Sequence, residues 1–313
     1  MAETGHQTRA WTDPRRRDWA DAGQRPLLTE AWHPMGEGRF PCVLLSHGTG
    51  GSAGQLAWLG EALAARGYVA AAVNHHGNTS AEPYMPQGFG LWWERARDLS
   101  AVLDLLLADA FFGTRIDPGR IGAAGFSLGG YTVIALAGAR TDLRALGEFC
   151  EGPQRDAGCD EPPEFPGMLA ALERLKRADP RVQASLRAHG ASYRDRRVGA
   201  VFAIAPVLAN AFTPAGLAEV SVPVAIVVGE ADGAAPLATN AQRLARFIPG
   251  AVLTVLPGQV GHYTFLAQGN AELRRAEPRF YVDHPSIDRA TVHRTVAGMA
   301  ADFFAQQLVR AVN

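Results

Sequence analysis

The sequence predicts an α/β protein in which helices cover both faces of a mainly parallel sheet. Short apolar runs of strand length alternate along the chain with longer segments in which apolar residues recur at helical spacing. The short runs are continuous rather than alternating, which is typical of strands buried on both faces, as in parallel sheets. The chain has 313 residues, 47% of them hydrophobic and 19% charged, so it can form a large core and is unlike a disordered chain.

The first elements follow a polar, arginine-rich segment, 1–26, which we expect to be a poorly ordered lead-in. The run 41–47 (PCVLLSH) predicts the first buried strand. A helix is expected over 53–66 because Gly67 follows it as a stop signal, and 68–74 (YVAAAVN) is the next strand. A second helix, over 91–108, is predicted from the spacing of Leu99, Val102, Leu103 and Leu106.

The later elements continue the same alternation. A strand over 120–124 leads directly into a helix over 128–139. This regular order of strand and helix favours crossover connections between parallel neighbours. The remaining strands are expected at 198–205, 222–228 and 251–256, and the remaining helices at 240–247 and 291–309.

Charge and composition exclude several classes of partner. The chain carries 30 basic and 31 acidic residues, so its net charge of −1 gives no basic surface for DNA, RNA or an anionic membrane. Lys176 is the only lysine, which leaves none for a phosphate-binding loop and makes Schiff-base chemistry improbable. There is no uncharged apolar run of transmembrane length and no apolar signal region near the start. We therefore predict a cytoplasmic protein, with the periplasm or secretion as the alternative if a leader has been removed.

The strongest chemical signal is the pentapeptide Gly125-Phe126-Ser127-Leu128-Gly129, which lies between an expected strand and an expected helix. This G-x-S-x-G pattern in that context is typical of a nucleophile elbow, a sharp turn that exposes a serine hydroxyl at the carboxyl end of a sheet. Small residues are needed on both sides because the turn brings strand and helix close together. The alternative is an ordinary glycine-rich turn with an inert serine.

A nucleophilic serine needs a base, and the base needs a carboxylate to orient it. In a strand–elbow–helix architecture the three residues follow the order nucleophile, acid, histidine. Asp232 follows one expected strand and His262 follows the next, so both should lie at the same sheet edge as Ser127. Glu230 is the nearest rival for the acid, and His284 and His293 come too late for the base.

Backbone N–H groups must stabilise the negative oxygen of a tetrahedral intermediate. The N–H of Leu128, at the start of a helix, is one predicted donor. The second should come from the loop 46–51 (SHGTGG), where we favour Thr49 and keep Gly48 as the alternative. We expect His47 to form a structural hydrogen bond within this loop rather than to act as a base.

Other residues give weaker signals. We list as candidates for an apolar acyl pocket Met85, Phe89, Trp92, Trp93 and Tyr131. Aromatic residues at such positions are also common in cores, and adjacent tryptophans cannot both face one way on a helix. His75 and His76 are adjacent, which is poor geometry for one metal ion, and no H-E-x-x-H motif is present, so no metal site is predicted.

Four segments together carry a family resemblance: HGTGGS (47–52), GFSLGGYTVIALAGAR (125–140), GEADGAAPLATNAQRL (229–244) and GHYTF (261–265). With the segment 56–80, they resemble the α/β-hydrolase superfamily, and more narrowly the bacterial dienelactone-hydrolase-like branch related to platelet-activating-factor acetylhydrolases. The resemblance runs from about residue 25 to the end of the chain. It implies a serine hydrolase that needs no metal or organic cofactor. True dienelactone hydrolases use a cysteine nucleophile, whereas this chain has Ser127, so that activity is not carried over.

One long segment, 141–197, interrupts the alternation, and connections of this length usually have a function or a structure of their own. We expect a cap over the site, with a decorative insertion as the alternative, and a catalytic domain formed by 27–140 and 198–313. Within the cap, Cys150 and Cys159 flank a loop and are either two unrelated thiols or a disulfide. The loop resembles an insertion in the same branch, which favours the disulfide, and a disulfide would suggest an oxidising compartment.

The predicted activity is hydrolysis of a small-molecule or lipid-like carboxylic ester through an acyl-enzyme. An amidase, a lactonase or a phospholipid acyl hydrolase would use the same three residues, so these activities remain alternatives. A ligand-binding protein with an inactive triad on the same fold is a further alternative. The sequence makes no prediction of the oligomeric state.

Overall fold

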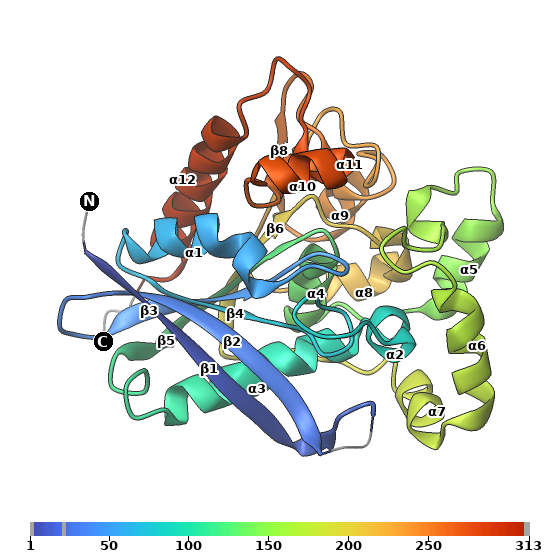
Figure 1. Ribbon diagram of the computed structural model, residues 1–313, viewed down its shortest axis with the longest axis horizontal. Helices are drawn as coiled ribbons and strands as arrows, with labels where there is room; N and C mark the ends of the chain where they lie inside the picture. The colour runs from blue at the N-terminus through green and yellow to red at the C-terminus, as the bar shows by residue number, and fades with distance from the viewer. Residues whose placement is uncertain (1–2, 21–22, 310–313) are drawn as a thin grey trace.

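The computed structural model describes residues 3–20 and 23–309. It contains an eight-stranded sheet with the order β1-β2-β4-β3-β5-β6-β7-β8 (Figure 1). The six strands from β4 to β8 in this order are parallel, whereas β1 and β2 join the sheet in antiparallel fashion. The strands are β1 (Thr4–Arg17), β2 (Gln24–Pro34), β3 (Phe40–Ser46), β4 (Val69–Val73), β5 (Ile116–Phe126), β6 (Val198–Ile204), β7 (Val224–Gly229) and β8 (Val252–Leu256).

The N-terminal segment corrects one prediction. Instead of a poorly ordered lead-in, the described part of 1–26 forms β1 and the start of β2, a long hairpin along the edge of the sheet (Figure 1). Its polar composition was misleading because two of its arginines, Arg16 and Arg25, are buried in ion pairs with Asp98 of α3. The N-terminal residues therefore belong to the main domain.

The parallel strands confirm the expected pattern. Residues of β4 are all buried, as are the last five residues of β3 and the last six of β5. The main differences are that β5 begins at Ile116, before the predicted start, and that the predicted helix 91–108 is shorter. That region forms α2 (Pro86–Gly90), a turn containing both tryptophans, and α3 (Glu94–Ala108).

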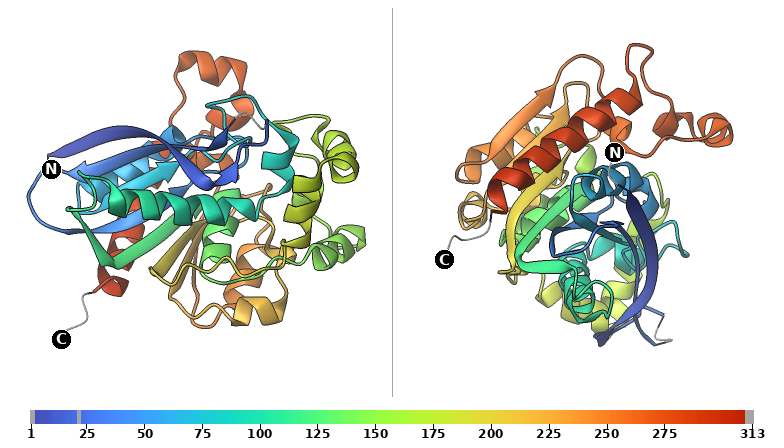
Figure 2. Two further views of the ribbon diagram at one scale, coloured as in Figure 1. Left: turned by 90° about the horizontal axis from the view of Figure 1, so that it is seen from below. Right: turned by 90° about the vertical axis from the view of Figure 1, so that its left-hand side faces the viewer.

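Helices cover both faces of the sheet (Figure 2). Helix α1 packs against α12, and α3 packs against α4. The helices of the main domain, besides α2 and α3, are α1 (Ala57–Ala64), α4 (Leu128–Leu136), α8 (Pro214–Ala218), α9 (Ala241–Phe247), α10 (Ala271–Ala276), α11 (Pro278–Tyr281) and α12 (Arg289–Gln307). Short 3₁₀ turns lie at η1 (Ala53–Leu56), η3 (Ala209–Ala211) and η4 (His262–Phe265). No helix in the described part of the chain is long and apolar enough to span a membrane.

The segment 141–197 is mostly helical. It comprises α5 (Leu143–Glu151), η2 (Ala157–Cys159), α6 (Met168–Ala178) and α7 (Pro180–Arg187), and α6 packs against α2 of the main domain. Lys176 on α6 forms an ion pair of 2.6 Å with Glu173. A disulfide joins Cys150 to Cys159.

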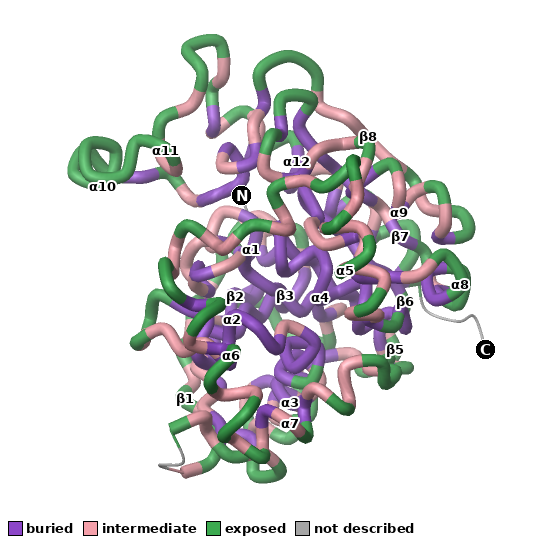
Figure 3. Tube along the Cα trace, turned by 90° about the vertical axis from the view of Figure 1, so that its right-hand side faces the viewer, coloured by how far each residue is buried: buried purple, intermediate pink, exposed green. Residues whose placement is uncertain are grey.

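The helices α10 and α11 form a second excursion, between η4 and α12, that the sequence reading missed. Their residues are mostly exposed, and in Figure 3 they extend away from the buried centre of the molecule. The site described next lies between this excursion and the segment 141–197.

Candidate active site

The turn between β5 and α4 has the geometry of a nucleophile elbow. Ser127 has φ 56°, a left-handed backbone conformation that non-glycine residues rarely adopt. The close approach of strand and helix explains the flanking glycines: a Cβ on Gly125 would lie 2.2 Å from the carbonyl oxygen of Gly129. A Cβ on Gly129 would lie 1.9 Å from the carbonyl oxygen of Ser46 on β3. These contacts leave room for glycine alone, so the local sequence fixes the sharp turn.

The structure brings the three predicted residues together. His262 Nε2 lies 2.9 Å from Ser127 Oγ, and His262 Nδ1 lies 2.8 Å from Asp232 Oδ2. All three residues are buried, with 6% of each exposed. A carboxylate can only accept here, so Nδ1 carries a proton and Nε2 is placed to accept the Ser127 hydroxyl proton.

Two backbone N–H groups hold the carboxylate of Asp232 in place. Its Oδ1 accepts from Ala234 at 3.0 Å and Ala235 at 2.7 Å, which leaves Oδ2 for the histidine. The rival acid, Glu230, points elsewhere, since its Oε2 accepts from the Gly258 N–H at 2.6 Å. The structure therefore brings Asp232, and not Glu230, to His262.

The other two histidines considered for the base lie outside this set. His284 is exposed and its Nδ1 lies 2.9 Å from Ser286 Oγ. His293 is buried in α12, where its ring stacks on Trp58 and its Nε2 lies 3.0 Å from the carbonyl oxygen of Thr264. Burial lowers the pKa of His293 to about 4, so its ring is neutral near pH 7.

The loop after β3 lies against the elbow. A Cβ on Gly48 would lie 3.3 Å from Cβ of Ser127, which shows how closely the two segments approach. In this loop the N–H of Gly50 donates to Asn78 Oδ1 at 2.7 Å. By contrast, the N–H groups of Gly48, Thr49 and Leu128 have no acceptor within the residues that the structure describes, and all three residues line the adjoining cavity. His47 forms the expected bond within the loop, with Nδ1 2.7 Å from the carbonyl oxygen of Gly48.

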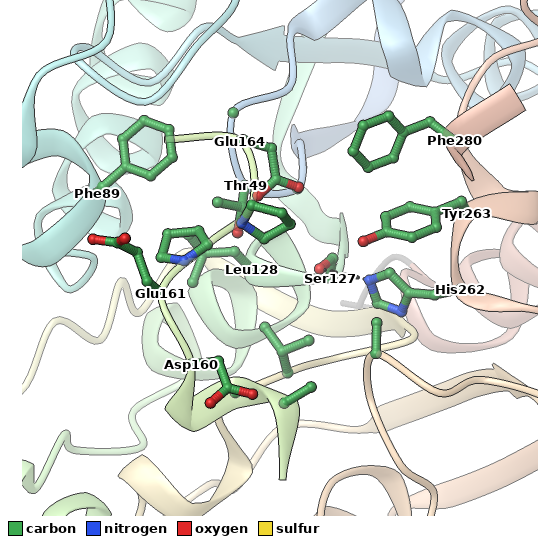
Figure 4. Close-up of a pocket in the computed structure, with 18 of the residues that line it drawn as sticks. Thr49, Phe89, Ser127, Leu128, Asp160, Glu161, Glu164, His262, Tyr263 and Phe280 are labelled. Carbon is green, nitrogen blue, oxygen red and sulfur yellow. Dashed lines mark hydrogen bonds between the residues drawn. The ribbon is translucent and has the colours of Figure 1, made fainter. Parts of the chain in front are cut away.

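A cavity of about 720 Å³ opens over Ser127, bounded by the main domain, the segment 141–197 and the α10–α11 excursion (Figure 4). Of the five candidate pocket residues, Phe89 and Trp92 line it. The prediction was wrong for the other three, Met85, Trp93 and Tyr131, which do not line it.

Packing explains these three errors. Trp93 is fully buried and its Nε1 donates to Ser185 of α7 at 3.0 Å. Tyr131 is also fully buried; its ring stacks on Phe212 at 4.7 Å and its hydroxyl bonds to Thr141. Met85 packs against the backbone of Gly77.

Several residues that shape the cavity were missed by the sequence reading. Tyr84, Tyr263 and Phe280 supply aromatic surface, and the disulfide-bonded cysteines form part of the wall. Charged residues are also present, namely Asp160, Glu161, Glu164, Glu277 and Arg279. Only Tyr263, in the motif with His262, carried a usable local signal.

Glu164 is one of the acids that line the cavity and are labelled in Figure 4. Its Cβ lies 3.2 Å from the position of a Cβ built on Gly50, so it overhangs the loop after β3. Burial raises the pKa of Glu164 above its ordinary value. A carboxyl of this kind in a cavity beside a serine and a histidine is typical of a functional site.

The adjacent histidines His75 and His76 have different partners. His75 Nδ1 lies 3.0 Å from Asp98, and His76 Nδ1 lies 2.7 Å from Glu82. Among residues 3–20 and 23–309, no group of three or more His, Cys, Asp or Glu side chains could hold a metal ion.

A solved structure has a fold similar to that of this chain. The ferulic acid esterase from Streptomyces cinnamoneus superimposes with a TM-score of 0.65 at 20% identity, covering 97% of this chain and 90% of that one. The chain has the α/β-hydrolase fold. The expected fold class is thereby confirmed.

Sequence comparison gives shorter matches. The model of the prolyl oligopeptidase family (Peptidase_S9) matches residues 55–147. The cutinase est1 of Thermobifida alba is 34% identical over 116 residues, 36% of each chain. The bis(hydroxyethyl) terephthalate hydrolase of Streptomyces coelicolor is 33% identical over 109 residues, 35% of this chain and 32% of that one. The chain thus spans about a third of the length of the curated relatives it matches.

Proposed function

We propose that the protein hydrolyses carboxylic esters through an acyl-enzyme formed on Ser127. The observation that carries this proposal is the position of His262 beside the nucleophile elbow. Its ring lies within hydrogen-bond distance of both Ser127 Oγ and Asp232 Oδ2. A base within reach of a nucleophile, and itself oriented by a carboxylate, is the arrangement that activates a serine hydroxyl.

In the first half of the reaction, His262 Nε2 takes the hydroxyl proton while Ser127 Oγ bonds to the acyl carbon. The tetrahedral intermediate collapses when the C–O bond to the alcohol breaks, and His262 returns the proton to the departing oxygen. In the second half, His262 takes a proton from water, whose oxygen attacks the acyl carbon. The Ser127 ester bond then breaks and the proton passes back to Oγ, so the enzyme is restored.

The N–H groups of Leu128 and Thr49 are the proposed donors to the negative oxygen. Both residues line the cavity and neither N–H has another acceptor in the described chain, which supports them as donors; the same holds for Gly48, which stays the alternative to Thr49. Loss of one such donor typically removes about 3–4 kcal/mol of transition-state stabilisation.

The cavity favours an uncharged small-molecule or lipid-like ester. Its walls combine aromatic surface with four carboxyl groups and one guanidinium, so an anionic ester would meet a net negative field. The names of the relatives, among them cutinase, lipase and bis(hydroxyethyl) terephthalate hydrolase, support esters as the bond type.

A peptide or other amide bond is the second candidate, because the family model that matches the chain is that of the prolyl oligopeptidases. Lactones and phospholipid acyl groups need the same chemistry and stay alternatives. Within the superfamily, the dienelactone-hydrolase-like branch remains our proposal from the sequence motifs.

We propose that the segment 141–197 is a cap, since residues of it form one wall of the cavity over Ser127. Its disulfide bears on location, because disulfides persist mainly in oxidising compartments. This favours the periplasmic or secreted alternative over the cytoplasmic location predicted from the sequence.

The test is hydrolysis of p-nitrophenyl esters by the purified protein and its Ser127→Ala variant, with Ser286→Ala, an exposed serine outside the cavity, as the control. We expect activity in the wild type and the control only, and fluorophosphonate labelling that requires Ser127. Activity that persists in Ser127→Ala would refute the mechanism, and absence of labelling in the wild type would favour the ligand-binding alternative. A series of acyl chain lengths, lactones and prolyl amides then separates the candidate substrates.

A further inference from the structure

A second serine, histidine and aspartate form an array behind the loop that follows β3. His75 Nε2 lies 2.9 Å from Ser46 Oγ, and His75 Nδ1 lies 3.0 Å from Asp98 Oδ2. All three residues are 0% exposed, and none lines the cavity. The array therefore has the distances of the catalytic residues but no access for a substrate, and the reaction proposed above makes no use of it.

The charges in this array are fixed. Burial alone would raise the pKa of Asp98, but the guanidinium groups of Arg25 and Arg16 hold it well below its ordinary value. Burial lowers the pKa of His75 to about 3, so its ring is neutral near pH 7. With Nδ1–H donating to the Asp98 carboxylate, Nε2 must accept from the Ser46 hydroxyl.

The backbone of His75 fixes the neighbouring ring of His47. The His75 N–H donates to His47 Nε2 at 3.1 Å, and since an amide can only donate, this nitrogen carries no proton. Burial and the charge of Arg95 keep the pKa of His47 well below its ordinary value, so the ring is neutral with its proton on Nδ1. His47 Nδ1–H therefore donates to the carbonyl oxygen of Gly48, 2.7 Å away.

That carbonyl belongs to the same peptide unit as the N–H of Thr49. In a planar trans peptide the C=O and the N–H point in opposite directions. Because His47 and the Gly51 N–H, which donates at 3.3 Å, both hold the Gly48 oxygen, the Thr49 N–H is directed away from them. Thr49 lines the cavity, and its N–H has no acceptor in the described chain.

Arg95 secures the start of the same loop. Its Nη2 donates to the carbonyl oxygen of His47 and, at 3.4 Å, to Ser46 Oγ. The hydroxyl of Ser46 thus donates to His75 while accepting from Arg95. Residues 46 and 47 are in this way held by Arg95 of α3 and by His75, the second residue after β4.

We propose that Ser46, His75, Asp98 and Arg95 act as positioning residues that aim the Thr49 N–H at the negative oxygen of the tetrahedral intermediate. The inference rests on the proposed function and deepens it, because it names residues outside the cavity that orient one of the proposed oxyanion donors. The support reaches the N-terminal hairpin, because Arg25 Nε and Nη2 donate to the two oxygens of Asp98 at 2.7 and 3.0 Å.

The first test replaces the histidine. His75→Phe keeps a planar ring and removes both side-chain bonds; His33→Phe is the matched control, since His33 is also buried but lies on β2 and does not line the cavity. We expect kcat of His75→Phe to fall by about 10- to 100-fold with KM within about twofold, less than the loss of a whole donor. The Ki of a trifluoromethyl ketone, whose adduct places an oxyanion at the same position, should rise by the same factor. His33→Phe should change neither value.

A second set of variants decides the question even if His75→Phe does not fold. His47→Asn keeps an amide N–H near the position of Nδ1, whereas His47→Gln keeps a polar atom near Nε2 and loses the bond to Gly48. We expect kcat of His47→Asn to exceed that of His47→Gln by about tenfold, and Ser46→Ala to lower kcat by several-fold. A merely structural role would give equal kcat in the two His47 variants.

The outcomes separate the two proposals. If Ser127→Ala keeps its activity, the proposed function fails. If Ser127→Ala is inactive but folded His75→Phe, or the His47 pair, shows wild-type kcat and Ki, the positioning role alone is overturned.

Discussion

The molecule contains two Ser–His–Asp arrays with almost the same internal distances. In the array of Ser127, the histidine lies 2.9 Å from the serine and 2.8 Å from the aspartate. In the array of Ser46, the corresponding distances are 2.9 and 3.0 Å. Only the first opens on a cavity and has a serine with positive φ at a helix N-terminus.

The difference shows that the hydrogen bonds of a triad do not by themselves make a nucleophile. Substrate access, a strained turn that presents the hydroxyl and N–H donors beside it are also required. The surroundings of the two aspartates differ as well. Asp232 accepts two backbone N–H bonds, whereas Asp98 is surrounded by arginines.

Substitution of the two aspartates should separate catalysis from stability. We expect Asp232→Asn to lower kcat by about 10⁴-fold through the wrong histidine tautomer, with a small change in stability. Asp98→Asn should lower the free energy of unfolding by about 3–5 kcal/mol, because it removes the carboxylate that pairs with buried Arg25 and one of the three that pair with Arg16. Steady-state kinetics and urea unfolding of both variants measure the two effects.

Glu230→Gln is the control for the first substitution, since that carboxylate lies two residues away but does not reach His262. It should keep kcat within about threefold, far from the loss expected of a triad member. A large kcat loss in Glu230→Gln, or wild-type kcat in Asp232→Asn, would contradict the assignment of the acid.

Two buried histidines, one of which belongs to the array of Ser46, should make the stability of the protein depend on pH. The pKa values of His75 and His293 are lowered in the folded state from 6.5 to about 3 and about 4. Between pH 6.5 and 4 the unfolded chain therefore binds protons that the folded chain does not, and stability falls as the pH falls. Each histidine contributes about 1.4 kcal/mol per pH unit within that window.

Urea unfolding at pH 7, 6 and 5 measures this slope. His293→Phe keeps an aromatic ring against Trp58 and should reduce the slope of stability against pH by the contribution of one of the two histidines. An unchanged slope in this variant would show that His293 is not held neutral in the folded protein.

The outer wall of the catalytic array depends on the disulfide. Reduction of the disulfide, or the double substitution Cys150→Ser/Cys159→Ser, should lower the free energy of unfolding by about 2–3 kcal/mol. The reason is that the unfolded chain is no longer cross-linked between two residues that are nine positions apart. Since both cysteines line the cavity, KM for esters should rise more than kcat falls. The free thiol, Cys42, is buried and its pKa is raised to about 12, so it should not respond to oxidant or reductant. A double variant that still responds to a reductant would contradict this account.

The smallest expected effect concerns the charge above the catalytic array. Glu164→Gln should raise kcat/KM for an ω-carboxylated p-nitrophenyl octanoate by about threefold, because it removes a partly screened repulsion between the Glu164 carboxylate and the substrate carboxylate. The kcat/KM for p-nitrophenyl octanoate, which has no such charge, should stay nearly unchanged. Glu173→Gln makes the same change of charge in the segment 141–197, outside the cavity, and is the control. Equal effects on both esters would indicate a change in cavity shape instead.

The array of Ser127 was predictable from the sequence, whereas the array of Ser46 was not. The elbow is a local motif, and the order of serine, acid and histidine follows from parallel strands that end at one sheet edge. The pairing of Arg25 with Asp98 joins residues 73 apart, and no local pattern marks it. A polar segment rich in arginine gave the same signal as a disordered tail.

Cavity residues were predicted least well, for a related reason. Trp92 and Trp93 are neighbours of the same type, yet one lines the cavity and the other packs under α7. Which side each faces depends on the turn between α2 and α3. The positions of the acids of the segment 141–197 depend on how this segment folds back over the sheet, and composition does not contain that information.

The single lysine of the chain has a practical consequence for immobilisation. Lys176 lies on α6, a helix of the segment 141–197 that packs against α2, with its ammonium group paired to Glu173. Amine-reactive supports will therefore attach the described part of the protein through one side chain, in one orientation, and on this segment. Coupling through Lys176 would immobilise one wall of the cavity and leave the sheet and the hairpin unmodified.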